Sequence, residues 1–431
     1  GGAAAGRSPV SPGDAAAEEE ALHPDHLLLL TSSLPLLKSR NAAVVTSVCA
    51  LHYAVGISSV ACRSACGRAL VRIARDRREV QYVVLAAIRS AVVDCPGAFA
   101  PFLQDFFIKA MDPAFTRLVK LDILASLALD PSAVTTVLTE LRTYLRHDDR
   151  HFVRAAVRAV AKVAEAHVVR AASSAQDGDG PPGRDHTHDG GRAAALTCLH
   201  GLVTLVAATE DAPVAGEAVV AARHVLQMTT FSLLAERAGA AAGRDPRGIQ
   251  STAVQRFLLL LVRALAPGVL DAPPGGAAPD GGRAAEPPRH LKLPSPAVAS
   301  LVWLVGEWGP SVGTPAAVPL PDTDAAAVRD EILRLLAGRF CGLDVEVKVQ
   351  AVHLASKLLL GAAARGDGAG PAPDLCAYIL AMGRADVDHD LRDRARFESN
   401  VLRLSVGLGE EAPVAGLGVD AARHMLLGTR P

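Results

Sequence analysis

Aromatic residues are scarce in this chain: only 4% of its 431 residues are Phe, Tyr or Trp. Half of the residues are nevertheless apolar, and most of these are Ala, Val and Leu. Alanine and leucine favour helices, whereas aromatic and β-branched residues together are typical of strands. The composition therefore favours closely packed helices over sheets.

The chain also has no excess of charge and few cysteines. Its 44 basic and 45 acidic residues give a net charge of -1, which provides no global reason to bind nucleic acid. The seven cysteines are scattered and odd in number, and no secretory signal is recognisable in the opening residues. We therefore expect reduced thiols in a cytoplasmic protein.

Two stretches without charged residues, Arg40 to Arg63 and Arg192 to Glu210, resemble membrane spans in their hydropathy. Polar residues and Gly56 interrupt the first stretch, and the second is short. Because a spanning helix needs about 20 predominantly apolar residues, we expect no transmembrane span.

Motifs of catalysis are absent from the sequence. It has no GxxxxGK[ST] phosphate loop, no GxSxG, no HExxH and no GxGxxG after a strand. The paired carboxylates Asp148 and Asp149 stand at a predicted helix start, where capping explains them. We expect no catalytic residues, no cofactor and no enzyme activity.

Repeated blocks of helical periodicity are the main positive feature. The run PDHLLLLTSSLPLLKSRNAAVV (Pro24–Val45) and the run RREVQYVVLAAI (Arg77–Ile88) each have a polar opening followed by apolar residues at helical spacing. Repeats of this kind bury their apolar faces only by stacking. The further helices that the spacing predicts are Asn41–Val55, Ser58–Arg75, Arg78–Asp94, Phe99–Met111, Pro113–Leu129, Ser132–Arg146 and Asp149–Val169.

Equivalent apolar anchors test the repeat period. The anchors are Val44, Val80, Phe152, Val214, Val298 and Val347, and the first gaps are 36 and 72 residues, whereas the later gaps are 62, 84 and 49. The irregular gaps coincide with Gly- and Pro-rich inserts, which are typical of loops between repeats. These inserts lie near residues 173–191, 239–248, 267–290, 309–322 and 361–373.

The predicted fold is therefore all-α: a HEAT/armadillo-like α-solenoid of two-helix repeats with long disordered inserts. Residues 1–25 are of low complexity and predicted to be disordered. The helical-repeat trunk is expected over residues 26–405, followed by a divergent tail over residues 406–431.

Further blocks give the chain a family resemblance. They are FFIKAMDP (Phe106–Pro113), LVKLDILASLA (Leu118–Ala128), SPAVASLVWLVGEWG (Ser295–Gly309) and LRDRARF (Leu391–Phe397). Together with the two opening runs, and in this order, they resemble the trunk of the beta-adaptins. The opening run and the RDRARF block look most like the beta subunit of adaptor complex three.

The resemblance implies a function in intracellular protein transport. It implies a large-subunit scaffold of a heterotetrameric vesicle-coat adaptor, acting between Golgi or endosomes and the lysosome or vacuole. Its partners would be the medium, small and second large adaptor subunits, and the complex would meet an Arf-type GTPase and an anionic membrane surface. It would be cytoplasmic and peripheral on Golgi and endosomal membranes and coated vesicles.

Alternatives to this interpretation remain open: a beta-adaptin of another adaptor complex, or a generic HEAT/armadillo scaffold. Family trunks carry further repeats before the Pro24 block, and many continue into a hinge and an appendage. The tail after Phe397 departs from the family pattern. The resemblance therefore implies a partial gene product.

Basic residues recur every four positions at Arg150, Arg154, Arg158 and Lys162, which we call the basic ridge. This spacing places them along one helix face. Such a face either contacts acidic headgroups or an acidic partner, or is merely solvated. It is the candidate electrostatic contact in this chain.

Leu118 to Asp122 fit the loose pattern of a clathrin box, Leu–apolar–any–apolar–acid. Such boxes act as extended peptides, whereas this segment has strong helical periodicity. We expect Leu118, Leu121 and Leu124 to form one core stripe. The pattern is therefore no basis for predicting clathrin binding.

The remaining candidates all have structural interpretations. Cys62 and Cys66 lie four residues apart without further zinc ligands at suitable spacing, which favours small buried hydrophobes. His186, His188 and Asp189 fall within a predicted insert, and we expect no metal site there. Trp303 and Trp308, on either side of Glu307, are expected in the core of the repeats. We therefore expect none of these residues to form a metal or cofactor site.

Overall fold

The computed structural model describes residues 23–55, 60–76, 78–129, 133–176, 186–209, 211–235, 256–262, 264–265, 292–308, 325–365, 372–406 and 417–427. All regular secondary structure in these ranges is helical, and none of their residues lies in a strand. The predicted all-α class is therefore confirmed. The predicted inserts at 239–248, 267–290 and 309–322 lie outside the described residues.

The chain divides into two compact units. The first contains Gly1–Cys198 and Phe231–Leu233, and the second contains Leu199–Thr230 and Leu234–Pro431. Helix α9 (His186–Ala208) crosses this division.

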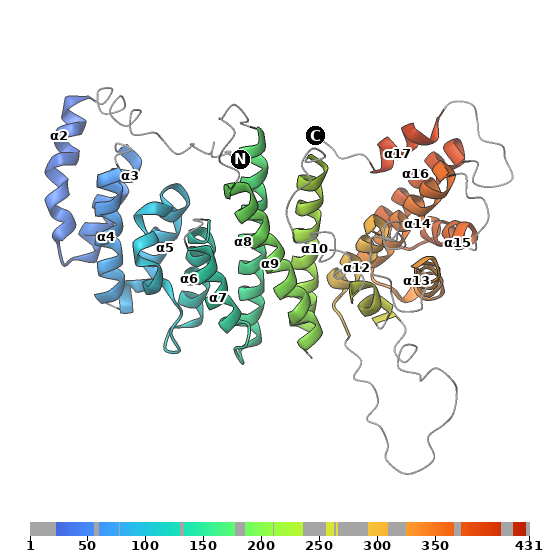
Figure 1. The fold of residues 1–431 in the computed structure, drawn as a ribbon, viewed down its shortest axis with the longest axis horizontal. Coiled ribbons are helices and arrows are strands. Elements are labelled where there is room, and N and C mark those ends of the chain that lie inside the picture. Colours follow the sequence, from blue (N-terminus) through green and yellow to red (C-terminus); the bar gives the residue numbers. More distant parts are fainter. Residues whose placement is uncertain are drawn as a thin grey trace, which may run out of the picture. The chain divides into compact units, whose positions relative to one another are not determined.

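The described helices of the first unit follow one another side by side in chain order (Figure 1). Helix α5 packs against α4 and α6, and α6 packs in turn against α8. The helices are α2 (Pro24–Ser33), η1 (Leu34–Lys38), α3 (Ala42–Val55), α4 (Val60–Asp76), α5 (Arg78–Asp94), η2 (Pro96–Ala98), η3 (Ala100–Phe106), α6 (Ala114–Leu127), α7 (Val134–Tyr144) and α8 (Arg150–Gln176).

The core of the first unit consists mainly of aliphatic side chains at helical spacing. Ile123, Leu124 and Leu127 of α6 are completely buried, as are Val157 and Val163 of α8. Each such side chain contributes roughly 1.5–3 kcal/mol through its removal from water. The scarcity of aromatic residues thus produces a core of small and branched side chains that lets helices approach closely.

Local signals account for several helix starts. The Asn41 Oδ1 atom accepts a hydrogen bond of 3.0 Å from the backbone N–H of Ala43, and α3 begins at Ala42, one residue after the predicted start at Asn41. Asp149 is the residue before α8. Its Oδ1 atom accepts hydrogen bonds of 3.0 and 3.3 Å from the backbone N–H groups of His151 and Phe152, both in the first turn of the helix. These caps satisfy backbone donors that the helix itself leaves unpaired.

The α-helix predicted over Phe99–Met111 is wrong. The segment forms the short 3-10 helix η3, and Phe107 then adopts an extended conformation with φ -61° and ψ 142°. Pro101 restricts the first turn, because proline lacks a backbone N–H. Pro113 disfavours helical geometry at the preceding residue, and side-chain hydrogen bonds hold the connection to α6.

Gly67 permits a close approach between α4 and η2. A Cβ atom at this position would lie 2.9 Å from the backbone carbonyl oxygen of Ala98. Real Cβ atoms essentially never come this near to a backbone atom, and the carbonyl of Ala98 belongs to rigid main chain. Only glycine fits between these two elements without moving one of them.

In the second unit, α14 contacts α12, α15, α16 and α17. Leu360 of α14, Ile379 of α15 and Leu402 of α16 are completely buried. The helices of this unit in the described part of the chain include α10 (Ala212–Ala235), α12 (Ser295–Trp308), α13 (Ala325–Arg339), η5 (Phe340–Gly342), α14 (Val345–Arg365), α15 (Ala372–Arg384), α16 (His389–Val406) and α17 (Val419–Leu427).

Some predicted boundaries differ from the helices that are observed. Helix α8 continues to Gln176 and α9 starts at His186, so both ends of the predicted insert 173–191 are helical. The same holds for the insert 361–373, since α14 ends at Arg365 and α15 begins at Ala372. Residues 177–185 and 366–371 lie outside the described part of the chain. Glycine in a helix costs only about 1 kcal/mol, and composition alone therefore misplaces such ends.

Helix α17 lies within the predicted divergent tail, 406–431. It contacts α14 and α16, and Ala422 is completely buried. The helical packing of the second unit thus extends beyond residue 405.

Candidate interaction surface

The basic ridge lies on α8, as its spacing predicted. Arg150, Arg158 and Lys162 are exposed, and Arg154 is half-buried. The side chains that α8 buries are mainly apolar, with Val157 and Val163 in the core, and include His167. The ridge is therefore a solvent-accessible line of cations on a rigid helix.

A carboxylate from the neighbouring helix meets the C-terminal end of the ridge. Lys162 Nζ lies 3.6 Å from Asp122 Oδ1 of α6, and Arg89 Nη1 of α5 lies 3.5 Å from Asp122 Oδ2. All three side chains are about half exposed, so each of these ion pairs contributes little to stability. Their effect is to fix the position of Asp122 between two cations on different helices.

The N-terminal end of α8 is held by an aromatic cluster. The Phe152 ring lies 5.6 Å from the Tyr144 ring and 5.0 Å from the His147 ring, between centroids. The guanidinium carbon of Arg117, from α6, lies 5.7 Å from the Phe152 centroid. These contacts set the direction in which α8, and with it the basic ridge, leaves the α7 connection.

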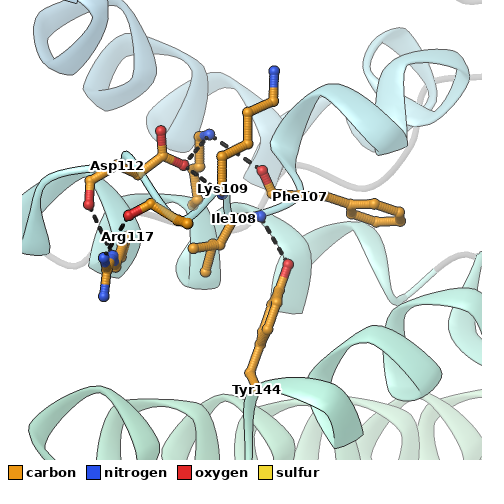
Figure 2. A network of polar contacts seen from close by, with 8 residues as sticks. Phe107, Ile108, Lys109, Asp112, Arg117 and Tyr144 are labelled. Carbon is orange, nitrogen blue, oxygen red and sulfur yellow. Dashed lines mark hydrogen bonds and ion pairs between the residues drawn. The ribbon is translucent and has the colours of Figure 1, made fainter. Parts of the chain in front are cut away.

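A buried polar network holds the connection between η3 and α6 (Figure 2). Lys120 is only 2% exposed, and its Nζ atom lies 2.7 Å from Asp112 Oδ2. The same ammonium group donates to the carbonyl oxygen of Phe107 at 3.2 Å. Asp112 Oδ2 also accepts from the backbone N–H of Lys109 at 2.9 Å. The buried charge is thus paired and hydrogen-bonded, as burial requires.

Two further side chains extend this network to the neighbouring helices. The Tyr144 hydroxyl of α7 accepts a 2.8 Å hydrogen bond from the backbone N–H of Ile108 (Figure 2). Arg117 donates to the carbonyl oxygens of Asp112 and Ala110 at 2.8 and 3.0 Å. Burial raises the pKa of Tyr144, so the hydroxyl remains neutral. Side chains of α6 and α7 therefore replace the backbone hydrogen bonds that a helix would have supplied here.

The same region decides the clathrin-box match. Residues 118–122 lie within α6. Lys120, in the middle of the pattern, is buried and forms an ion pair with Asp112. The segment is therefore helical and part of the core, as expected. One detail of the prediction is wrong, because Leu118 is 48% exposed whereas Leu121 and Leu124 are buried. Leu118 shares its direction around the helix with the buried Ala125, seven residues later, so the neighbouring helices cover this direction only farther along α6.

The buried Lys120 was missed in the sequence, although a signal for it exists. Lys120 shares a helix face with Leu124 and Leu127, both of which are completely buried. A lysine in such a position needs a partner, since lysine is almost never fully buried without one. The sequence does not identify the partner, because Asp112 approaches only through the irregular connection.

The thiols near α3 and α4 form hydrogen bonds rather than a plain apolar cluster. Cys66 is buried as predicted, but Cys62 is half-buried and its Sγ atom lies 3.1 Å from His52 Nδ1. The Ser33 hydroxyl donates to the carbonyl oxygen of Leu30 at 2.8 Å and lies 3.0 Å from His52 Nε2. Ser33 therefore accepts from Nε2–H, which leaves Nδ1 to accept from the thiol.

The His52 and Cys62 side chains in this series of contacts are uncharged. Burial lowers the pKa of His52. A hydrogen bond with Cys66, together with burial, raises the pKa of the Cys62 thiol. Among the described residues no group of three or more His, Cys, Asp and Glu side chains is arranged to hold a metal ion. These side chains link α2, α3 and α4.

Two other sets of candidates have different outcomes. His186, His188 and Asp189 belong to the first turn of α9, and their side chains lie outside the described residues, as does that of Trp308. Trp303 is half-buried and not wholly in the core, and cations from two other helices lie near its ring.

No helix in the described ranges has the length and apolar character needed to cross a bilayer.

The stacked helices with a buried polar network and an exposed basic ridge define a helical-repeat trunk. Comparison with protein families matches residues 13–176 to the Adaptin N terminal region. The chain is 29% identical over 377 residues to AP-3 complex subunit beta-1 of Mus musculus, and this match covers 88% of the chain. It is 27% identical over 406 residues to AP-3 complex subunit beta of Dictyostelium discoideum, again over 88% of the chain.

A solved structure agrees with the fold. A chain in the homology model of the full-length AP-3 complex in an intermediate open conformation matches 87% of this chain and 51% of its own length, with a TM-score of 0.55 and 18% identity. The predicted resemblance is confirmed: residues 13–176 match the Adaptin N terminal region, and the chain is similar to the AP-3 beta subunits. It spans 26% of the mouse and 31% of the Dictyostelium relative.

Proposed function

We propose that this chain is the trunk of a beta-type large subunit in a heterotetrameric vesicle-coat adaptor. The observation that carries the proposal is similarity to AP-3 beta subunits over 88% of the chain. A trunk of stacked helices supplies a long surface for partners and makes or breaks no bond. The partners would be the medium, small and second large adaptor subunits.

The finer part of the proposal concerns recruitment. The assembled adaptor would act on the cytoplasmic side of Golgi and endosomal membranes, with an Arf-type GTPase and anionic lipids as its contacts. The basic ridge supports this, because it offers positive charge at several positions along one exposed helix face. Charge of this kind mainly steers association and loses strength with added salt.

Co-purification tests the scaffold. The tagged chain, expressed with the other subunits of its species, should retain a delta-like large subunit and a medium subunit of the third adaptor class. Retention of subunits from another adaptor class would assign the chain to that class. Retention of no adaptor subunit would contradict the proposal.

Charge reversal tests the basic ridge. The double variant Arg154→Glu and Arg158→Glu should reduce binding of the assembled complex to vesicles with anionic lipid, most strongly at low salt. The matched control is Arg142→Glu with Arg146→Glu, two exposed arginines at the end of α7. Equal membrane binding by wild type and the ridge variant, with normal assembly, would leave the ridge a solvated face.

A further inference from the structure

Two exposed aromatic rings lie against each other on the neighbouring helices α5 and α6. The ring centroids of Tyr82, from α5, and Phe115, from α6, are 5.2 Å apart. The two residues are 44% and 55% exposed, and Leu118, one turn further along α6, is exposed as well. We call these three residues the apolar patch. Apolar side chains that gather on a surface among polar residues are typical of protein or membrane contacts.

The apolar patch lies on the same side of α5 and α6 as a cluster of ion pairs. On α5, Arg89 follows Tyr82 by seven residues, and on α6, Asp122 follows Phe115 by seven. The Arg89 Nη1 atom lies 3.5 Å from Asp122 Oδ2. Seven residues are nearly two full turns, or about 10 Å along a helix. The two helices therefore run in the same direction, and each carries a ring on the side that carries charge two turns later.

Helix α8 runs in this direction too. Lys162 Nζ lies 3.6 Å from Asp122 Oδ1. Further along both helices, His167 Nε2 lies 2.7 Å from the carbonyl oxygen of Ala128. The residue numbers on α6 and α8 increase together from the first contact to the second. The basic ridge therefore borders the surface that α5 and α6 form, with α6 in the middle (Figure 1).

Cations of the basic ridge lie level with the apolar patch. Arg158 precedes Lys162 by four residues, just as Leu118 precedes Asp122 by four. Because α6 and α8 are parallel, the exposed Arg158 lies level with Leu118. Arg89 and Lys162 are two cations around the one carboxylate of Asp122, so this cluster is positive overall. The surface combines an apolar centre with positive charge beside it.

We infer that the apolar patch and the basic ridge together contact an anionic lipid bilayer, with Tyr82, Phe115 and Leu118 at the boundary between headgroups and acyl chains. The inference rests on the proposed function, in which the ridge meets anionic lipids, and adds an apolar part to that contact. Tyrosine is enriched at this boundary, since its ring is apolar and its hydroxyl stays hydrated. The neighbouring cations attract the anionic headgroups.

The extent of the charge favours a bilayer over an acidic protein segment. The ridge spans twelve residues of α8, which is about 18 Å along the helix. A bilayer presents headgroups along this whole length, whereas a peptide must place its acids at matching positions. The exposed Glu79 lies on α5, and α6 separates it from the ridge (Figure 1). Apolar burial and electrostatic attraction together give peripheral binding that either one alone makes only marginal.

Sedimentation of the assembled complex with anionic vesicles tests the inference. The double variant Phe115→Ser with Leu118→Ser should weaken binding at least about fivefold, because less apolar surface enters the bilayer. This ratio to wild type should persist as salt rises, since apolar burial is not screened, whereas the loss in Arg154→Glu with Arg158→Glu should shrink. The matched control is Phe397→Ser with Leu404→Ser, two exposed residues of α16, which should bind like wild type.

The single variant Phe115→Trp reports insertion directly. Vesicles with brominated acyl chains should quench its fluorescence more than that of the wild-type complex, because bromine quenches only tryptophan that comes close to it. Phe397→Trp, at an exposed phenylalanine of similar exposure, should gain no such quenching. Phe115→Trp keeps an aromatic ring at an exposed position. Absence of quenching in Phe115→Trp would therefore overturn the inference even if the double variant failed to fold.

The other outcomes separate the inference from the proposed function. Vesicle binding of the Phe115 and Leu118 double variant equal to wild type would overturn the inference, and so would an equal loss in the α16 control. Weaker subunit association with normal vesicle binding would overturn it in favour of a protein interface. Loss of binding in the ridge variant alone would overturn the inference and leave the proposed function standing. A wild-type complex that binds no anionic vesicles would overturn the proposed lipid contact and the inference together.

Discussion

At the scale of single residues, Lys120 carries the largest structural consequence in the first unit. Its ammonium group joins the Asp112 carboxylate and the carbonyl oxygen of Phe107 in a site where the lysine is 2% exposed. An ion pair at such depth adds little over a well-packed apolar pair, but losing one partner leaves the other charge uncompensated. The ion pair of Lys120 therefore fixes the conformation of the η3–α6 connection, whereas its net contribution to stability is small.

Replacement of Lys120 by Met should destabilise the first unit by about 3–5 kcal/mol, because Asp112 would remain buried without its cation. The double variant Lys120→Met with Asp112→Asn should recover part of this loss. Denaturant unfolding measures both. The control Arg89→Met removes an exposed partner of Asp122 and should cost at most about 1 kcal/mol. Similar losses for Lys120→Met and Arg89→Met would contradict the assigned role.

His52 gives the same region a dependence on pH. Burial lowers the pKa of His52 below its usual value of 6.5, so the unfolded chain takes up a proton at higher pH than the folded chain. Stability should therefore fall as the pH decreases from 6.5 toward the folded pKa. His52→Gln should flatten unfolding free energy against pH over this window. An unchanged slope in the variant would assign the pH dependence to other groups.

At the scale of elements, α6 shows which part of a helix can be assigned from its sequence. The apolar run Leu118–Ala128 predicts the helix and the burial of Leu121 and Leu124, both observed. The exposure of Leu118 depends on how far the neighbouring helices extend along α6. Periodicity predicts which side of a helix faces the core. The neighbouring helices determine how much of that side is buried.

Leu121→Ala should accordingly cost about 2–5 kcal/mol, since truncation in a packed core leaves a cavity. Leu118→Ala, the same replacement three residues earlier, should change stability by no more than about 0.5 kcal/mol, as surface replacements do. Both follow from denaturant unfolding of the full chain. A larger effect at Leu118 than at Leu121 would mean that the buried face of α6 has been assigned incorrectly.

The contrast between α5 and η3 explains the main error in the sequence-based fold. Helix α5 is observed over Arg78–Asp94, the range that its apolar period predicted. The FLQDFFIKAM segment has comparable helical character but begins beside Pro101 and ends before Pro113. Its geometry depends on Lys120 and Tyr144, which lie in later helices. Local signals predict elements that local forces stabilise, and they fail where distant side chains supply the hydrogen bonds.

The candidate surfaces differ in the same way. The basic ridge follows from four-residue spacing alone, so its place on α8 could be predicted. The contacts of the Trp303 ring combine residues from α10, α12 and α14: Arg223, Trp303 and Lys357 are separated by 80 and 54 positions along the chain. No periodic pattern brings such positions together. The sequence indicated Trp303, but only the packing of helices places a cation on its ring.

At the scale of the whole molecule, the division into two compact units has consequences for unfolding. Each unit has its own buried core, with Leu124 in the first and Leu360 in the second. Repeat proteins behave as sums of neighbouring contacts, and their cooperativity need not extend along the entire chain. A single free energy of unfolding then describes neither unit.

We expect denaturant unfolding in separable steps. Leu124→Ala should shift one transition and Leu360→Ala the other, because each replacement creates a cavity in only one core. Hydrogen exchange of amides in α6 and α14 would measure the two units directly. One common transition that both variants shift equally would show that the units unfold together.

Gly67 has a consequence for inheritance that follows from its place in the packing. The backbone of Ala98 lies where a Cβ atom at residue 67 would be placed, so the added methyl group of alanine requires α4 or η2 to move. Gly67→Ala is nevertheless among the mildest changes by chemical similarity. A variant of this kind would be scored as harmless by substitution class, yet it would act as a loss-of-function allele through the amount of folded subunit.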